Sequence, residues 1–263
     1  MRLAADPWAT RIDRADALAA EGDSGAALVG FYGRLLRAQK RVDDALTARP
    51  PTGEIEDDLE TVLDSATPLL KMVGEWGPDP LAAKARALAG GAASRLREEL
   101  LEYWRARSDR LFFSKALLQP YAEQLARDPT RVIAGVDGAP DGRCPRCGGV
   151  PQLAIIEGDS SIAGEGGARS LQCATCLATW PFQRLRCPAC GNEDERRLGY
   201  YQSPTFPYVR VDACEACGRY LKTIDLGRHG LAVPLVDEIA SATLDVWATD
   251  RGYVKIELNL IGL

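Results

Sequence analysis

Apolar residues recur every three or four positions through the first half of the chain. Between residues 24 and 48 they alternate with charged residues in this way, at Leu28, Phe31, Tyr32, Leu35, Leu36, Val42 and Leu46. This period predicts an amphipathic helix with one buried stripe. Asp23 and Ser24 are its N-cap candidates, and the Pro50–Pro51 pair ends it.

Four more segments of the first half carry the same helical period. They cover residues 7–21, 54–75, 80–107 and 109–127, and Pro68 is expected to kink the helix over 54–75. Gly90 and Gly91 interrupt the helix over 80–107, which leaves a helix break and a close helix crossing both open. We therefore expect a bundle of about five helices over residues 1–135.

The second half changes to short segments that are typical of strands and are separated by glycine and proline. Residues 151–156 and 168–172 predict a hairpin around the turn-rich stretch 158–167. Residues 197–201 and 208–211 repeat this plan, which indicates an internal duplication. We expect one ribbon over 136–186 and a second over 187–230.

The last part of the chain again shows the apolar periodicity of helices and strands that pack into a core. A strand is predicted over residues 220–226, an amphipathic helix over 234–250 and a final strand over 253–258. Residues 231–263 are expected to pack on the two ribbons and brace them against each other. The fold class predicted from these patterns is α+β, with the helices first and the ribbons after them.

All eight cysteines of the chain lie in the second half, in four CxxC pairs. The pairs are Cys144/Cys147, Cys173/Cys176, Cys187/Cys190 and Cys214/Cys217. Two CxxC turns together supply four sulfurs for a tetrahedral metal ion, so the sequence predicts two mononuclear sites with four cysteine ligands each. Glycine follows three of the pairs, which suits a metal knuckle whose chain turns through positive φ, whereas Leu177 follows the second pair.

Other uses of cysteine fit this sequence less well. The N-terminal residues lack the apolar run of a secretion signal, which argues against a disulfide framework and favours the cytoplasm. No segment approaches the length that spans a membrane. A thioredoxin-like motif would need one CxxC at the start of a helix after a buried strand, and these pairs lie among glycines, prolines and short strands.

The sequence identifies the CxxC pairs as metal ligands more firmly than it shows which two pairs share one metal ion. Loops of 25, 10 and 23 residues separate successive pairs, so joining first to second and third to fourth gives two ribbons of similar size. A cross-brace of first with third and second with fourth stays open. Either arrangement fills the metal shell with protein sulfur, which favours a structural role, and both iron and zinc accept four thiolates.

The charge balance and the remaining polar residues argue against two classes of function. Residues 141–263 contain 13 Lys and Arg against 15 Asp and Glu, a balance that disfavours nucleic-acid binding. Arg184, Arg186, Arg196 and Arg197 are expected to be solvated loop charges. His229, the single histidine, is expected in a turn, so no nucleophile with a histidine base can be assembled and an enzyme is not predicted.

These motifs resemble the FdhE family of formate dehydrogenase accessory proteins. The resemblance rests on the order of the four pairs, on Cys144-Pro-Arg-Cys147-Gly-Gly-Val-Pro151 and on Cys214-Glu-Ala-Cys217-Gly-Arg-Tyr-Leu-Lys222. Residues 11–46 and 237–263 are also similar to the two ends of the family's proteins. Leu177 in place of glycine is a departure, and the N-terminus is short beside longer relatives.

The resemblance implies a cytoplasmic, non-enzymatic factor needed for active formate dehydrogenase. Its partner would be the molybdenum or tungsten catalytic subunit, and the eight cysteines would hold metal as in rubredoxin-like iron sites. A homodimer is compatible with the sequence. Two alternatives stay open: a rubredoxin-like electron-transfer or redox protein, and, less favoured, a nucleic-acid-binding zinc ribbon.

Overall fold

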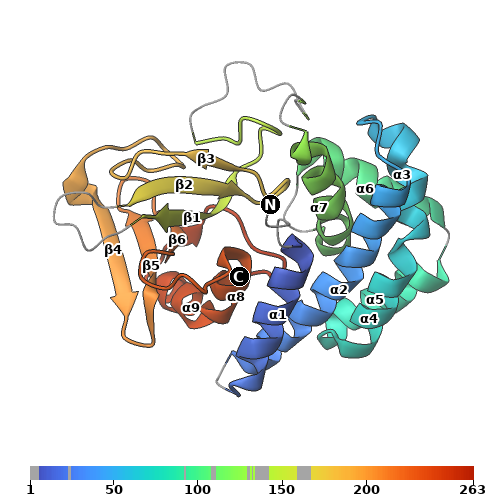
Figure 1. The fold of residues 1–263 in the computed structure, drawn as a ribbon, viewed down its shortest axis with the longest axis horizontal. Helices are drawn as coiled ribbons and strands as arrows, with labels where there is room; N and C mark the ends of the chain where they lie inside the picture. The colour runs from blue at the N-terminus through green and yellow to red at the C-terminus, as the bar shows by residue number, and fades with distance from the viewer. Residues whose placement is uncertain are drawn as a thin grey trace, which may run out of the picture.

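The computed structural model describes residues 6–22, 25–91, 93–107, 111–128, 131, 133, 142–158 and 167–263. The N-cap candidates Asp23 and Ser24 lie outside this part of the chain, as do most of the turn expected over 158–167 and the expected domain boundary at 135/136. The helices of the first half of the chain gather on one side of the molecule and the sheet on the other (Figure 1), which confirms the α+β class.

The described residues up to Asp128 form seven helices. They are α1 (Pro7–Ala20), α2 (Ala26–Ala48), α3 (Ile55–Asp64), α4 (Ala66–Trp76), α5 (Asp79–Gly90), α6 (Ala93–Ala106) and α7 (Phe112–Arg127). The expectation of a kink at Pro68 was wrong, because the helix breaks at Ser65 and Pro68 falls in the first turn of α4. Proline is tolerated there, since that amide has no helical partner. The Gly90–Gly91 pair ends α5 and is a break.

The strands form a single sheet. They are β1 (Pro151–Glu157), β2 (Ala168–Cys173), β3 (Thr179–Pro181), β4 (Leu198–Ser203), β5 (Phe206–Cys214), β6 (Arg219–Asp225) and β7 (Val254–Lys255), and a 3-10 turn (Glu195–Arg197) precedes β4. The order across the sheet is β3-β2-β1-β6-β5-β4, with β7 beside β6. The two predicted hairpins are present as the antiparallel pairs β1/β2 and β4/β5.

The order of turns and strands in the sheet repeats, as the internal duplication predicts. In each half a CxxC turn precedes the first strand, a second CxxC turn follows the second strand, and a third strand returns beside the second. The halves are joined by the parallel pair β1/β6, with Ile155 opposite Ile224. The two halves therefore repeat side by side in one sheet.

Two short helices pack on the sheet, and the first of them also contacts the bundle. The predicted helix over 234–250 is divided at Ser241 into α8 (Pro234–Ala240) and α9 (Ala242–Asp250). Helix α8 contacts β1 and β6 on one side and α1 and α2 on the other, as its place between sheet and bundle in Figure 1 shows. Val236 and Ile239 of α8 join the core of the helical half. The final strand is shorter than expected and consists of Val254 and Lys255 alone.

No helix in the described ranges combines the length and the hydropathy needed to cross a membrane.

A group of buried charges lies where β6, α8, α9 and β7 meet. Lys222 and Lys255 face Glu238 and Asp245, and the relative exposures of these four residues are 0%, 4%, 0% and 2%. Lys222 Nζ lies 2.5 Å from an Asp245 oxygen, and Lys255 Nζ lies 2.9 Å from the other. Lys255 also donates to Glu238, and Tyr220 Oη donates to Asp245. Buried charges require partners of this kind, so the group holds the helices at a defined place on the sheet.

The carboxyl of Asp58 in α3 allows a prediction of how the protein's stability depends on pH. Burial raises the pKa of its carboxyl, but the N–H groups of Thr52 and Gly53 and the hydroxyl of Tyr121 donate to it, so the pKa is lowered overall. A lowered pKa contributes stability that is present above the ordinary value of 3.8 and is lost as pH falls through the lower folded value. We expect Asp58→Asn to be less stable than the parent at pH 7, and the difference to shrink below about pH 4, in urea titrations at each pH. A constant difference from pH 7 to pH 2 would contradict this.

Candidate metal centres

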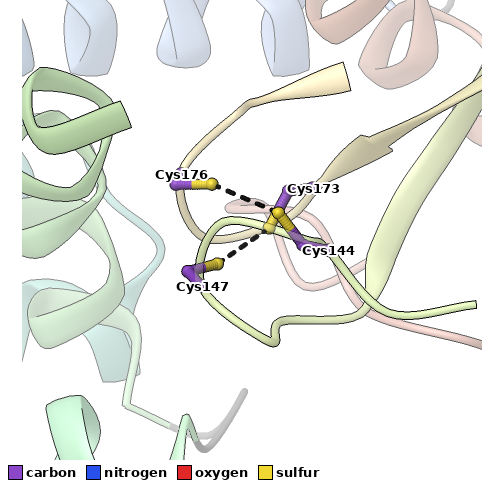
Figure 2. A group of neighbouring side chains, drawn as sticks. All are labelled: Cys144, Cys147, Cys173 and Cys176. Carbon is purple, nitrogen blue, oxygen red and sulfur yellow. Dashed lines mark hydrogen bonds between the residues drawn. The ribbon is translucent and has the colours of Figure 1, made fainter. Parts of the chain in front are cut away.

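The first two CxxC pairs come together in one cluster. Cys144 and Cys147 precede β1, while Cys173 ends β2 and Cys176 lies in the turn that follows it. The sulfurs point toward one another (Figure 2), with 3.6 Å between those of Cys144 and Cys176 and 3.4 Å between those of Cys147 and Cys173. All four residues are buried.

The third and fourth pairs form the second cluster in the same way. The sulfurs of Cys187 and Cys217 are 3.8 Å apart, as are those of Cys190 and Cys214. Cys187 and Cys214 are buried, whereas Cys190 and Cys217 reach the surface. The pairs thus combine first with second and third with fourth, and the structure does not have the cross-brace.

The spacing of the sulfurs fits a tetrahedral metal ion. With metal–sulfur bonds of about 2.3 Å, neighbouring sulfurs in a tetrahedron lie about 3.8 Å apart. Within each cluster all four sulfurs lie within 4.8 Å of one another. The cysteines are free, since these separations are far longer than the roughly 2.05 Å of a disulfide. The donor set and the geometry therefore suit one Zn²⁺ or iron ion per cluster.

The electrostatics of the first cluster favour a cation among its sulfurs. Hydrogen bonds from Cys147, Cys173 and Cys176 lower the pKa of Cys144, whereas hydrogen bonding to Cys144 and Cys147 raises that of Cys176. Four sulfurs this close cannot all carry a charge unless a cation lies between them. The N–H groups of Arg146 and Thr175 also point at the sulfurs of Cys144 and Cys173, at 3.4 and 3.3 Å. Such donors stabilise thiolate ligands.

The CxxC turns share one backbone design. In the first three, the N–H of the first cysteine pairs with the carbonyl five residues later, for example Cys144 with Gly149 and Cys187 with Asn192. In all four, the residue after the second cysteine has positive φ, near +70° at Gly148, Gly191 and Gly218 and +58° at Leu177. Leu177 therefore adopts a conformation that costs a non-glycine residue about 1–2 kcal/mol. Its side chain packs with Leu153, Ile155 and Leu235, and this burial offsets the cost.

This difference between knuckles gives a prediction. Nothing lies within 4 Å of a Cβ built on Gly218, so Gly218→Ala should destabilise the protein by about 1 kcal/mol through backbone strain alone. Leu177→Gly removes the strain but also the buried side chain, which is worth about 1.5–3 kcal/mol, so it should also destabilise, by about 1 kcal/mol net. Urea unfolding of both variants measures these losses. A stabilised Leu177→Gly would show that strain outweighs burial.

The two clusters have different surroundings. The first lies against α7 in a small core that includes Ala122, Trp180 and Leu221. Gln119 of α7 donates to the carbonyl of Ala174 at 3.0 Å, and so ties the helix to the second knuckle. The second cluster belongs to the sheet half made of β4, β5 and β6, and two of its cysteines, Cys190 and Cys217, are exposed to solvent. The first centre thus joins the two halves of the molecule, and the second faces outward.

The other residues singled out in the sequence fall in different places. His229 lies in a turn, as expected, with its ring 4.5 Å from that of Tyr208 and its Nε2 3.4 Å from Arg14. The side chain of Arg196 is 89% exposed, but Arg184 and Arg186 line a cavity beside Cys187. That cavity was missed because its walls come from segments distant in sequence. The arginines gathered just before the third CxxC pair are the signal that could have found it.

Comparisons with known proteins agree with this arrangement. Residues 185–261 match the family described as FdhE, C-terminal domain. A "Protein FdhE homolog" of Aquifex aeolicus (strain VF5) is 40% identical over 119 residues, which cover 45% of this chain and 41% of that protein. One of Edwardsiella ictaluri (strain 93-146) is 29% identical over 201 residues, covering 73% and 63%. The chain thus spans about half the length of these relatives.

A solved structure shows the same fold. It is described as the crystal structure of the FdhE protein from Pseudomonas aeruginosa, with a TM-score of 0.69 and 21% identity, and the match covers 99% of this chain and 97% of that one. The resemblance seen in the cysteine motifs is confirmed by the domain match and the two relatives. Over these matched regions the chain is similar to FdhE proteins, and its residues 185–261 match the FdhE C-terminal domain.

Proposed function

We propose that this protein is a cytoplasmic accessory factor, not itself an enzyme, that is needed for the formation of active formate dehydrogenase. The observation that carries the proposal is the match of residues 185–261 to the FdhE C-terminal domain, a segment that contains all four cysteines of the second cluster. The factor docks on the molybdenum or tungsten catalytic subunit, as the family resemblance implies.

The eight cysteines hold two mononuclear ions in this proposal, iron or zinc. Cys144, Cys147, Cys173 and Cys176 form one ligand set, and Cys187, Cys190, Cys214 and Cys217 form the other. The bound ion supplies a cross-link between two turns, and iron would in addition accept or give one electron. Four sulfurs leave no open position for water or substrate, which supports an accessory role over metal-assisted hydrolysis.

The test uses host cells with and without this gene. We expect formate-driven dye reduction to be lost in the deletion strain while the catalytic-subunit polypeptide persists, because an accessory factor acts on a client that is already synthesised. A plasmid copy should restore activity, and a copy with both Cys190 and Cys217 replaced by serine should not. Unchanged activity in the deletion strain would overturn the proposal.

Exposure of the second cluster favours one alternative, a rubredoxin-like electron carrier. Cys190 and Cys217 bring its edge to the surface, where an electron can pass to a partner without crossing the protein. Iron-loaded protein would then show visible absorption that bleaches on reduction and returns on oxidation. A centre that loses its iron on reduction, or that is isolated with zinc alone, excludes this role.

A further inference from the structure

A cavity of about 180 Å³ lies beside the second cluster, lined mainly by β4, β5, β6 and the segment before Cys187. The buried cysteines Cys187 and Cys214 form part of its wall. Five arginines line it, from β2, from the segment before Cys187, from β5 and from β6, and they are Arg169, Arg184, Arg186, Arg210 and Arg219. Among the described residues that line it, the only carboxylate is that of Asp212.

Two of these arginines share the single carboxylate. Arg169 is only 4% exposed, and its Nη2 lies 3.3 Å from Asp212. Arg210 Nε lies 2.7 Å from the other oxygen of Asp212, and the carboxylate also accepts a hydrogen bond from Thr223. Arg169 also donates to the carbonyls of Gln183 and Arg186, and its guanidinium lies 5.6 Å from the ring centre of Phe182. One negative charge therefore faces two guanidinium groups, one of them buried.

The contacts of two further arginines leave their charges uncompensated. Among the described residues, Arg184 donates to the carbonyl of Gly167 and Arg219 to that of Lys255. Carbonyl oxygens satisfy hydrogen bonds but carry no net charge. Arg186 is different, because it pairs with Glu193 at 3.4 Å. Even beside a metal centre with four thiolates, which carries two negative charges when the ion is divalent, the lining of the cavity retains net positive charge.

The mouth of the cavity adds apolar surface. Leu185 and Tyr200 line it with 55% and 66% of their surface exposed. The guanidinium of Arg210 lies 5.5 Å from the ring centre of Tyr200. Guanidinium forks match the oxygens of phosphate, and an aromatic ring beside them offers a stacking surface.

We propose that this cavity binds a phosphate monoester whose phosphate meets Arg184 and Arg210 and whose small aromatic body lies against Leu185 and Tyr200. The charge on the walls selects a dianion, and the volume exceeds what a phosphate group alone fills. The site is independent of the proposed accessory function and goes beyond it.

Isothermal titration of the full-length, metal-loaded chain with phenyl phosphate at 0.15 M salt tests the site. We expect one molecule to bind per chain, with inorganic phosphate about tenfold weaker because it lacks the aromatic body. Arg184→Gln and Arg210→Gln should each weaken phenyl phosphate by about tenfold or more. Tyr200→Ala should weaken the binding of phenyl phosphate but leave the binding of inorganic phosphate unchanged.

Arg37→Gln is the matched control, because it removes the same charge from a surface pair with Asp16 on the helical half. Arg37→Gln should bind phenyl phosphate with the same affinity as the parent. Arg184 is exposed and, within the described part of the chain, its side chain donates to the carbonyl of Gly167, so its variant should fold even if Arg210→Gln does not. The proposal is overturned by absence of saturable binding, by equal weakening in Arg37→Gln, or by equal affinity for phenyl phosphate and inorganic phosphate.

Discussion

Replacing Cys173 by serine is expected to lower the free energy of unfolding by about 5 kcal/mol and to remove the metal of the first centre alone. The sulfur of Cys173 is fully buried at the end of β2, and its cluster lies against α7. Loss of the ion would leave buried thiols and N–H donors without their partner and would free the two turns that hold the sheet against the bundle. Urea unfolding, followed with metal analysis, measures both effects.

Cys217→Ser is the matched control, because it makes the same chemical change in a cluster at the surface. We expect it to remove the metal of the second centre and to disorder the turns around it, while the core between sheet and bundle stays folded. The loss of stability should therefore be clearly smaller than for Cys173→Ser. Equal losses in the two variants would show that burial against α7 does not distinguish the two centres.

The second large effect is expected at Lys222. Its Nζ is fully buried and donates to Asp245 and to the carbonyl of Glu238. Lys222→Ala would leave Asp245 and Glu238 with Lys255 as their one remaining cation in this group. Removing one partner of a buried ion pair costs about 3–5 kcal/mol, because the other charge stays desolvated. We expect a loss of this size in urea unfolding at pH 7.

Lys40→Ala provides the comparison for a surface pair. Lys40 and Asp44 are one turn apart on α2, and the Asp44 side chain is 60% exposed. Exposed pairs at this spacing contribute about 0.3–0.5 kcal/mol, so the variant should be nearly as stable as the parent. A loss below about 1 kcal/mol for Lys222→Ala would contradict the role assigned to the buried group.

The helices could be predicted because a single residue period reports which face is buried. The missed breaks at Ser65 and Ser241 have a common cause. Ser65 Oγ donates to the carbonyl of Thr61, and Ser241 Oγ donates to those of Asp237 and Glu238. A serine that bonds to the preceding turn can end a helix or sit within one, so the apolar period continues across it.

The joining of the ribbons could not be predicted in the same way. Hairpin partners are neighbours in sequence, whereas β1 and β6 are far apart along the chain, and alternation does not specify such a partner. Lys222 looks like a solvent-facing residue of a half-buried strand. Because β6 lies between β1 and β5 and is covered by α8, the side chain is buried instead.

Candidate ligands were easier to identify than their surroundings. A CxxC spacing places two sulfurs on one turn whatever the rest of the chain does, so the eight cysteines stand out from sequence alone. Their surroundings depend on tertiary packing. The first cluster is buried against α7, whereas the second is exposed at Cys190 and Cys217. The arginine-lined cavity has the same origin.

Metal content per chain, measured on protein purified without added metal, tests the central claim most directly. The account predicts two iron or zinc ions per chain, and one each in Cys144→Ser/Cys173→Ser and in Cys190→Ser/Cys217→Ser. Retention of the other ion in each variant would show that the two clusters are separate four-cysteine centres. Fewer than one ion per parent chain, or loss of both ions from the surface-cluster variant, would contradict it.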